Sequence, residues 1–317
     1  MTAALEQRGY LVSPLVYDEL PTRRAKVHHK VRHELAERVG LSGTAAREQR
    51  ISARVLSVLR EVRPDVILVV KGDLLSDDVW QAFPGSGART ALWMYDELRR
   101  TRLTVERLRH VGPLASYSRL DTEALNAAGI DCVYVPGGFD SLHPVIPAPS
   151  TPEVSFIGAR YPQRERLLTE VHSLGVPVRA YGRDWSHDWR DKARTWSRQR
   201  PDLPADRDID RSRAYGVMAA STASLNVHGD QDGFTLRTFE APGVGALPLE
   251  DRDEVSEFYD VGTETLTFAG AEEVLEHYLR AHTDLLWARR IREAGQRKTL
   301  EKHTLGHRMA ELEKLWM

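Results

Sequence analysis

A proline-rich segment limits most strongly how this chain can fold. Residues 144–152 carry four prolines in nine positions, and proline fixes the backbone, so the sequence predicts a stiff interdomain linker. A chain of 317 residues is long enough for two domains of ordinary size. We expect a first domain over 1–143, a second domain over 153–300, and a final helix over 301–317 that returns to the first domain.

Short apolar runs alternate with helical patterns on both sides of this linker. Val66–Val70 is a near-continuous apolar run of the kind that is buried on both faces of a parallel sheet. The other expected strands are 89–94, 114–118 and 132–135 before the linker, and 154–157, 178–181 and 223–227 after it. This alternation is typical of doubly wound sheets, in which functional side chains follow the carboxyl ends of the strands. The sequence therefore predicts an α/β protein with two Rossmann-like domains.

Two carboxylates, Asp232 and Glu240, stand with seven residues between them after the last of these strands. Pro242 has no N–H and is tolerated only in the first turn of a helix, so we expect a helix to begin near 236–238. Its first amides, 235–237, would point outward and suit a diphosphate. Glu240 would lie one turn further in, where it can accept two hydrogen bonds from a ribose diol. The alternative is a solvated Asp-Gly turn before an ordinary helix.

The segment DGFTLRTFEAPGVGALPL at 232–249 resembles the Glu-x7-Glu donor motif of family-4-type GT-B glycosyltransferases, with Asp in the first position. It is most similar to the CgeB-like branch, named for a spore maturation protein. The similarity covers roughly residues 90–317, with the further landmarks VYVPGGFD, VSFIGARYPQR, YGRDW and HTLGHRM. It implies a GT-B fold, in which two Rossmann-like domains face each other across a cleft.

The resemblance implies roles for the motif residues. Glu240 would bind the nucleotide ribose, Asp232 would lie beside the transferred sugar, and the loop amides would bind the diphosphate. The other motif residues expected at the donor are Gly233, Phe234, Thr235, Leu236 and Arg237. The donor is a nucleoside-diphosphate sugar and therefore a substrate, so no cofactor is expected. GT-B enzymes generally lack a metal-binding Asp-x-Asp motif, so we expect no metal.

Further donor candidates follow the strands of the second domain. Gly158 lets the backbone approach a ligand, and Arg160 offers a bidentate fork to a departing diphosphate. Arg164 is a similar candidate, and each arginine has the alternative of being a surface residue near a helix start. The remaining candidates, with core packing as their alternative, are Tyr181, Gly182 and Trp185 for the base, and His228 for the sugar or phosphate.

Asp96 is the candidate on the acceptor side. It follows a strand of the first domain, where it can bind acceptor hydroxyls or act as a general base, and capping of a helix is the alternative. Lys71, Gly72 and Asp73 hold a similar position after the preceding strand. A base is required for inversion, but the family-4-type motif implies retention.

The N-terminal end departs from the pattern of related enzymes. Residues 2–9 have the pattern of an amphipathic helix that ends at a glycine, a strand is expected over 10–16, and 21–53 have helical spacing. In nucleotide-sugar enzymes of this class a strand and a glycine-rich loop precede the first helix. We expect the start of the protein to lie upstream of Met1, because losing a central strand would leave ladder hydrogen bonds unpaired. The alternative is a first sheet without that strand.

Composition excludes several classes of protein. The net charge of -2 argues against a general nucleic-acid binder. No apolar stretch is long enough to span a membrane, and no signal peptide opens the chain, so we expect a cytoplasmic protein. The single cysteine, Cys132, excludes an internal disulfide, and the 12 histidines show no spacing typical of metal ligands.

These features together predict a glycosyltransferase that moves a sugar from a nucleotide sugar to an acceptor, with retention and without metal. The acceptor can be a glycan, a small molecule or a protein. Two alternatives remain open. One is a non-catalytic nucleotide-sugar-binding module, and the other is a nucleotide-sugar epimerase on the same fold.

Overall fold

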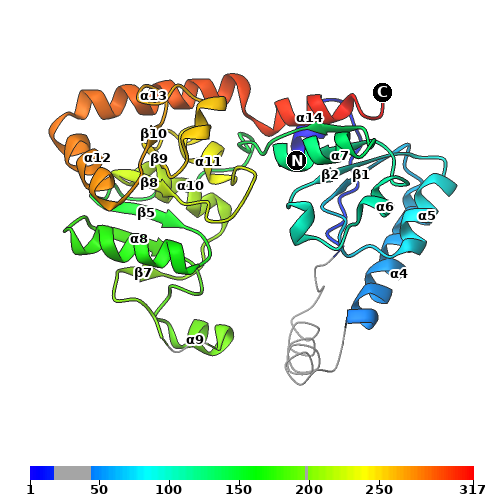
Figure 1. Cartoon of the computed structure of the whole chain (residues 1–317), viewed down its shortest axis with the longest axis horizontal. Coiled ribbons are helices and arrows are strands. Elements are labelled where there is room, and N and C mark those ends of the chain that lie inside the picture. Colours follow the sequence, from blue (N-terminus) through cyan, green and yellow to red (C-terminus); the bar gives the residue numbers. More distant parts are fainter. Residues whose placement is uncertain (18–43, 197–198) are drawn as a thin grey trace. The chain divides into compact units, whose positions relative to one another are not determined.

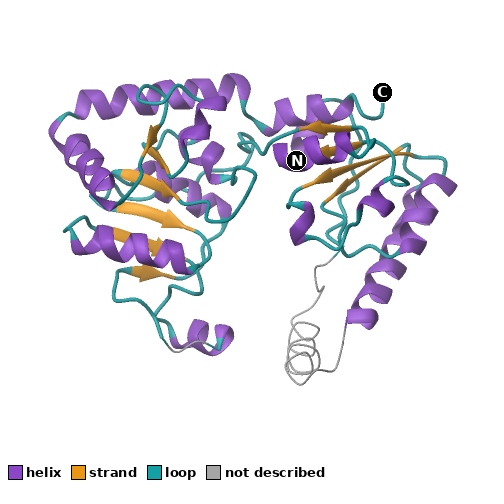
Figure 2. Ribbon diagram, in the orientation of Figure 1, coloured by secondary structure: helices purple, strands orange, loops and turns teal. Residues whose placement is uncertain are grey.

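The computed structural model describes residues 1–17, 44–196 and 199–317. They form two compact units (Figure 1). Unit 1 comprises Met1 and Gly137–Arg308, and unit 2 comprises Thr2–Pro136 and Met309–Met317. Each unit contains a parallel sheet with helices packed against it (Figure 2). The predicted α/β class with parallel sheets is confirmed.

Unit 2 is built on a four-stranded parallel sheet in the order β1-β2-β3-β4. The strands are β1 (Val66–Val70), β2 (Arg89–Met94), β3 (Leu114–Ser116) and β4 (Cys132–Tyr134). The helices are α1 (Thr2–Glu6), α4 (Thr44–Val62), α5 (Asp77–Gly85), η2 (Leu98–Arg100), α6 (Val105–Leu108) and α7 (Arg119–Ala127). Strand β2 is buried over its last four residues because it lies between two neighbouring strands.

The strand predicted for residues 10–16 is wrong. These residues form no regular structure, and the Leu11 side chain is fully exposed, at 101 %. A strand needs a partner for its backbone groups, and none of the described strands pairs with this segment. The helical pattern predicted over 21–53 lies mostly outside the described residues, and its described end falls in α4.

The last nine residues complete unit 2. Trp316 is 5 % exposed, and its indole N–H donates to the Tyr10 hydroxyl at 3.0 Å. The Arg89 guanidinium donates to the Trp316 carbonyl at 2.6 Å. The Tyr10 hydroxyl donates in turn to Glu313 at 2.7 Å. Helix α14 (Leu305–Glu313) therefore begins in unit 1 and ends in unit 2.

Unit 1 is built on a six-stranded parallel sheet in the order β10-β9-β8-β5-β6-β7. The strands are β5 (Val154–Ile157), β6 (Val178–Tyr181), β7 (Ala205–Asp206), β8 (Ala223–Asn226), β9 (Pro248–Glu250) and β10 (Leu266–Thr267). The helices are α8 (Pro162–Ser173), α9 (Trp189–Thr195), α10 (Arg211–Ala220), α11 (Arg237–Gly243), η3 (Asp253–Glu257), α12 (Ala271–Thr283) and α13 (Leu285–Lys302).

The strand order of unit 1 reverses next to its first strand. From β5 the chain proceeds outward to β6 and β7, and it then returns to the other side of β5 with β8, β9 and β10. In parallel α/β sheets such a reversal opens a crevice at the carboxyl ends of the two strands concerned, and ligands bind there. The carboxyl ends of β5 and β8 therefore locate the region of unit 1 best suited to a ligand.

The proline-rich segment packs against helix α10. The Ile146 amide donates to the Ser212 carbonyl, and the Thr151 amide donates to the Ala220 carbonyl, each at 3.0 Å. A Cβ atom added to Gly216 would lie 1.8 Å from the Ile146 carbonyl oxygen. The segment thus lies on the surface of unit 1 at backbone contact distance, and the division between the units falls earlier, between Pro136 and Gly137.

Candidate functional site

The predicted donor residues gather at the carboxyl ends of β5, β6 and β8. Gly158 follows β5, Gly182 follows β6, and His228 follows β8. The Arg237 guanidinium links helix α11 to this edge, because its Nε donates to the Ile157 carbonyl at 3.2 Å. Residues from four separate segments therefore meet where the strand order of unit 1 reverses.

Glu240 is the central acid of this region. It lies in the first turn of α11, which begins at Arg237 as predicted, and it is 1 % exposed. Its carboxylate forms an ion pair with Arg237 and a second with Arg211, whose Nε lies 3.5 Å from Oε1. The Tyr215 hydroxyl donates to the same oxygen at 3.3 Å. The buried carboxylate therefore lies between two cationic side chains.

Arg211 and Tyr215 are site residues that the sequence interpretation missed. They stand four residues apart on α10, so they lie on one face of that helix. Asp210 caps the helix by accepting from the Arg213 amide at 3.0 Å. The helical pattern in the sequence begins only at Arg213, so a helix predicted from that pattern leaves Arg211 outside it. The Asp210 cap was the signal that could have revealed the pair.

Burial raises the pKa of Tyr215 to about 12 and lowers that of Arg237 to about 10. At neutral pH Tyr215 is therefore a neutral donor, and Arg237 is a cation. Both groups can therefore donate to the Glu240 carboxylate, whose oxygens can also accept hydrogen bonds from the hydroxyl groups of a ligand.

The loop that precedes α11 is anchored by aromatic and backbone contacts. Phe234 is 5 % exposed and packs edge-on against the rings of His228 and Phe258. The Arg252 guanidinium stacks on Phe234 and donates to the Asp232 carbonyl at 3.0 Å. These contacts fix the loop without using the Asp232 carboxylate, and Gly233 between them is buried.

The start of α11 presents unpaired amides. Within the described parts of the chain, the amides of Thr235, Leu236 and Arg237 have no hydrogen-bond partner. The Thr235 hydroxyl donates to Asn226 at 2.9 Å, which ties the helix start to the end of β8. Because α11 has only seven residues, its dipole adds little, and the amides act as individual donors.

A buried polar network lies beneath the loop. The His228 ring is held at both nitrogens, by Asp251 at 2.5 Å and by the Thr238 hydroxyl at 3.2 Å. Thr238 also donates to Glu250 at 3.2 Å, and the Asn226 amide donates to the same carboxyl at 2.8 Å. His228 is 1 % exposed, so its ring lies beneath the loop and stabilises it through these hydrogen bonds.

Glu250 makes the stability of unit 1 depend on pH. Burial raises its pKa to about 7, while the nearby His228 opposes the shift. The folded chain therefore binds a proton that the unfolded chain releases at lower pH. The stabilisation by protonated Glu250 is complete below pH ~4.5 and is lost as the pH rises toward about 7.

We expect Glu250→Gln, which cannot ionise, to escape this loss. The free energy of unfolding of the variant minus that of the natural chain should increase by on the order of 2 kcal/mol from pH 5 to pH 8. Urea denaturation at the two pH values measures the difference, and Glu254→Gln, at an exposed position, is the control. An equal pH dependence in both proteins would contradict the prediction.

Arg160 and Arg164, the two predicted cations after β5, have different surroundings. Arg164 is 7 % exposed and donates to the carbonyls of Val227 at 2.8 Å and Ala159 at 3.1 Å. It thereby ties the ends of β5 and β8 together. Arg160 forms a two-pronged ion pair with Glu165 at 2.9 and 3.0 Å, and its side chain is 20 % exposed. Arg160 is the better placed of the two to meet a ligand.

The prediction that Trp185 stacks on a nucleotide base needs correction. Trp185 is fully buried in the core, against Phe156, and its indole N–H donates to the Gly158 carbonyl at 2.9 Å. Its ring therefore supports the loop after β5 and presents no face to a ligand. Gly182 serves close packing, because a Cβ there would lie 2.8 Å from the Gly158 carbonyl oxygen. Tyr181 is half-buried.

The acceptor candidate Asp96 belongs to unit 2. It follows β2, and its carboxylate lies 2.6 Å from the Lys71 ammonium at the end of the neighbouring β1. No helix cap is formed by Asp96, since the residue at the start of η2 is Glu97. Glu97 is fully buried and accepts from Tyr117 at 2.6 Å, so Asp96 is the more accessible acid of the pair.

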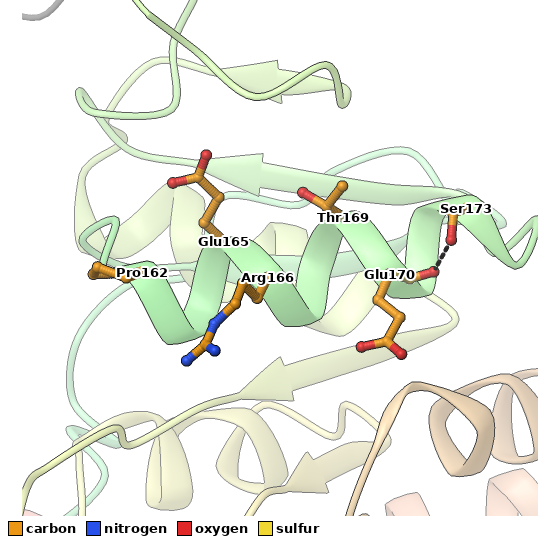
Figure 3. Close-up of a pocket in the computed structure, with 6 residues that line it drawn as sticks. All are labelled: Pro162, Glu165, Arg166, Thr169, Glu170 and Ser173. Atoms are coloured by element: carbon orange, nitrogen blue, oxygen red, sulfur yellow. Dashed lines mark hydrogen bonds between the residues drawn. The ribbon is translucent and has the colours of Figure 1, made fainter.

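A pocket of about 660 Å³ runs along the outer side of α8 (Figure 3). The residues that line it are Pro162, Glu165, Arg166, Thr169, Glu170 and Ser173. None of them is among the predicted donor residues, and Figure 3 shows polar side chains that point outward from a single helix. The pocket is therefore no candidate for the donor site.

Two kinds of feature are absent from the described residues. No group of three or more His, Cys, Asp or Glu side chains in this part of the chain could hold a metal ion. None of the helices described combines the length and the apolar character needed to cross a membrane.

Residues 163–314 match the model of a protein family described as "Glycosyl transferase-like". This match contains the motif loop, Glu240 and the strands β6, β8 and β9. No match was found among curated protein sequences.

Solved structures share the fold across most of the chain. A glycosyltransferase from Rickettsia africae has a TM-score of 0.59 at 13 % identity, covering 83 % of this chain and 79 % of its own. HepE from Anabaena, solved with UDP and glucose, has a TM-score of 0.56 at 13 % identity, covering 82 % and 80 %. A protein from Listeria monocytogenes proposed to be a UDP-N-acetylglucosamine 2-epimerase has a TM-score of 0.51 at 15 % identity, covering 82 % and 78 %. The chain therefore has the GT-B fold of these proteins, as predicted.

Proposed function

We propose that this protein is a glycosyltransferase that takes a sugar from a nucleoside-diphosphate sugar, with unit 1 as its donor domain. The observation that carries the proposal is the buried Glu240 carboxylate, which lies between Arg211 and Arg237 at the end of the sheet where the strand order reverses. The glycosyl transferase-like match over residues 163–314 supports it. We also propose that the protein belongs to the CgeB-like branch and that its motif is a family-4-type donor motif.

The ribose of the donor would bind to Glu240. Two vicinal hydroxyls can donate to one carboxylate, and they would replace the weak contacts that Tyr215 and Arg211 now make at 3.3 and 3.5 Å. Arg237 would then be able to turn toward the diphosphate. The unpaired amides at the start of α11 would supply further donors to the same phosphate oxygens.

Departure of the nucleoside diphosphate is the step that the cations would assist. Negative charge builds up on the leaving phosphate in the transition state. Cations and N–H groups held in fixed positions therefore stabilise that state more than they stabilise the bound nucleotide sugar. We assign Arg160 and Arg237 to this role, and Asp232 to contacts with the transferred sugar. Asp96 is the proposed acceptor-side residue.

The remaining parts of the proposal concern the reaction and its setting. We propose transfer with retention, without metal or cofactor, to an acceptor that is a glycan, a small molecule or a protein. We propose the cytoplasm as its location. Nucleic acid is not among the proposed partners, because a net charge of -2 argues against general nucleic-acid binding.

A thermal-shift screen with nucleoside diphosphates tests the donor assignment, with UDP first because the HepE structure contains it. A ligand at a hundred times its dissociation constant stabilises the folded state by about 2.7 kcal/mol, which gives a clear rise in melting temperature. If no nucleoside diphosphate or nucleotide sugar raises it, the proposal fails.

The stabilising nucleotide sugar then separates the alternatives. A transferase releases nucleoside diphosphate, and the release accelerates when an acceptor is added. An epimerase, favoured only by the likeness to the Listeria protein, would interconvert two sugars or release an epimer. A binding module would return the donor unchanged.

A further inference from the structure

Helix α9 exposes its apolar residues. Trp189 is 71 % exposed and Trp196, directly after the helix, is 54 % exposed. Ala193 between them is exposed as well. The spacing of four residues places Trp189 and Ala193 on one face of the helix, and Trp196 follows the helix end with a left-handed backbone, at a φ of 55°. A surface helix ordinarily turns its apolar face toward the core, so α9 has the opposite orientation.

Polar contacts hold α9 in this orientation. Asp191, on the opposite face, is 1 % exposed and accepts two hydrogen bonds from Arg207, at 2.8 and 3.1 Å. The Arg200 guanidinium donates to the Thr195 hydroxyl at 2.8 Å and to the Ser186 carbonyl at 2.9 Å. The side of α9 that faces the rest of unit 1 is therefore polar, and its side chains are hydrogen-bonded there. This leaves the tryptophan face outward.

Positive charges surround the tryptophans. Arg190 and Arg194 are exposed, and Lys192 is half-buried. The acidic residues of α9 do not neutralise these positive charges on the outer face of the helix. Asp191 is buried, and Asp188 lies at the helix start, where it accepts from the Arg190 amide at 2.7 Å. The outward surface of α9 is thus both aromatic and cationic.

We propose that α9 docks on an anionic phospholipid surface. Indole rings favour the membrane–water interface because they combine an apolar body with a polar N–H group. Arginine and lysine beside them attract anionic headgroups. The centre of a protein–protein interface is usually depleted of charge, whereas here cations alternate with the aromatic rings. A stripe this short implies reversible binding that needs both the rings and the charges.

This proposal does not rest on the proposed transfer reaction. The helix lies beyond the edge strand β7 (Figure 1), outside the residues assigned to the donor. Its test measures binding to lipid and needs neither nucleotide nor acceptor.

Vesicle flotation with the whole chain tests the proposal. We expect the protein to float with vesicles of equal parts phosphatidylcholine and phosphatidylglycerol, and to remain behind with phosphatidylcholine alone. Trp189→Ser combined with Trp196→Ser should lower the partition coefficient by roughly tenfold or more. Arg190→Gln combined with Arg194→Gln should lower it similarly and weaken its dependence on salt. Both pairs are exposed, so circular dichroism should show unchanged folding.

Leu285→Ser combined with Leu286→Ser provides a matched control. These leucines are 71 % and 63 % exposed at the start of α13, so they are as apolar and accessible as the tryptophans. Full flotation of this variant supports a site at α9. Failure of the natural chain to float, equal flotation with neutral vesicles, or an equal loss in the leucine variant would each overturn the proposal.

Discussion

Replacing Glu240 with glutamine should weaken nucleoside diphosphate binding at least about tenfold while leaving the protein folded. Hydrogen bonds to a charged group are worth ~1.5–3 kcal/mol each, and a ribose diol would make two with this carboxylate. Glutamine has nearly the same shape, and its carbonyl can still accept from Tyr215, which lies 3.3 Å from the carboxylate. Isothermal titration calorimetry with the nucleotide found by thermal shift measures the loss.

The control for this experiment is Glu254→Gln in the same unit. Its side chain is 68 % exposed, and no ligand contact is proposed for it. An unchanged dissociation constant for the Glu240 variant, with a melting curve that shows a folded protein, would remove Glu240 from the site. A comparable loss in the Glu254 variant would point to general electrostatics instead.

Replacing Gly216 with alanine should destabilise unit 1 by roughly 3 kcal/mol or more. The added Cβ would lie 1.8 Å from the Ile146 carbonyl oxygen and 2.9 Å from its carbon. Both atoms belong to the backbone of the proline-rich segment, so no side-chain rotation relieves the clash. The segment would have to lift from α10, which breaks the hydrogen bond from Ile146 to Ser212. Urea denaturation followed by circular dichroism measures the change.

Gly85 offers the matched comparison. It also lies in a helix, α5, but a Cβ added there meets no atom within 4 Å. Because alanine favours helices more than glycine does, Gly85→Ala should be neutral or stabilising by up to about 1 kcal/mol. If Gly216→Ala unfolds at the same urea concentration as the natural chain, the contact between the proline-rich segment and α10 is not as close as described.

The sequence predicted the sheets well because parallel strands leave a strong local signal. The run predicted at Val66–Val70 is β1, and the strand predicted over 178–181 is β6. Buried strands need apolar residues on both faces, so their positions can be predicted from short apolar runs in the sequence. The segment 10–16 shows the limit of this argument. Its residues favour a strand, but a strand also needs a neighbour, which no local pattern specifies.

The details of the site were harder to predict because burial depends on the whole fold. Trp185 has the residue type of a stacking platform, and only its environment shows that both faces of the ring are covered. Glu250 ends an apolar strand, where a carboxyl group gives no hint that it is fully enclosed. Arg211 was missed for a different reason. The start of its helix was placed two residues late, and helix ends are the least certain part of any such prediction.

Unit 2 is assembled from two stretches of chain that are separated by the whole of Gly137–Arg308. On the ribosome, at ~5–20 residues per second, its last piece emerges roughly 10–30 s after its first. During that interval Tyr10 and Arg89 lack the partners that Glu313 and Trp316 supply. In a nascent chain, unit 1 should therefore fold before unit 2 is complete, although most of unit 2 is synthesised first. Pulse proteolysis of stalled chains would detect that order.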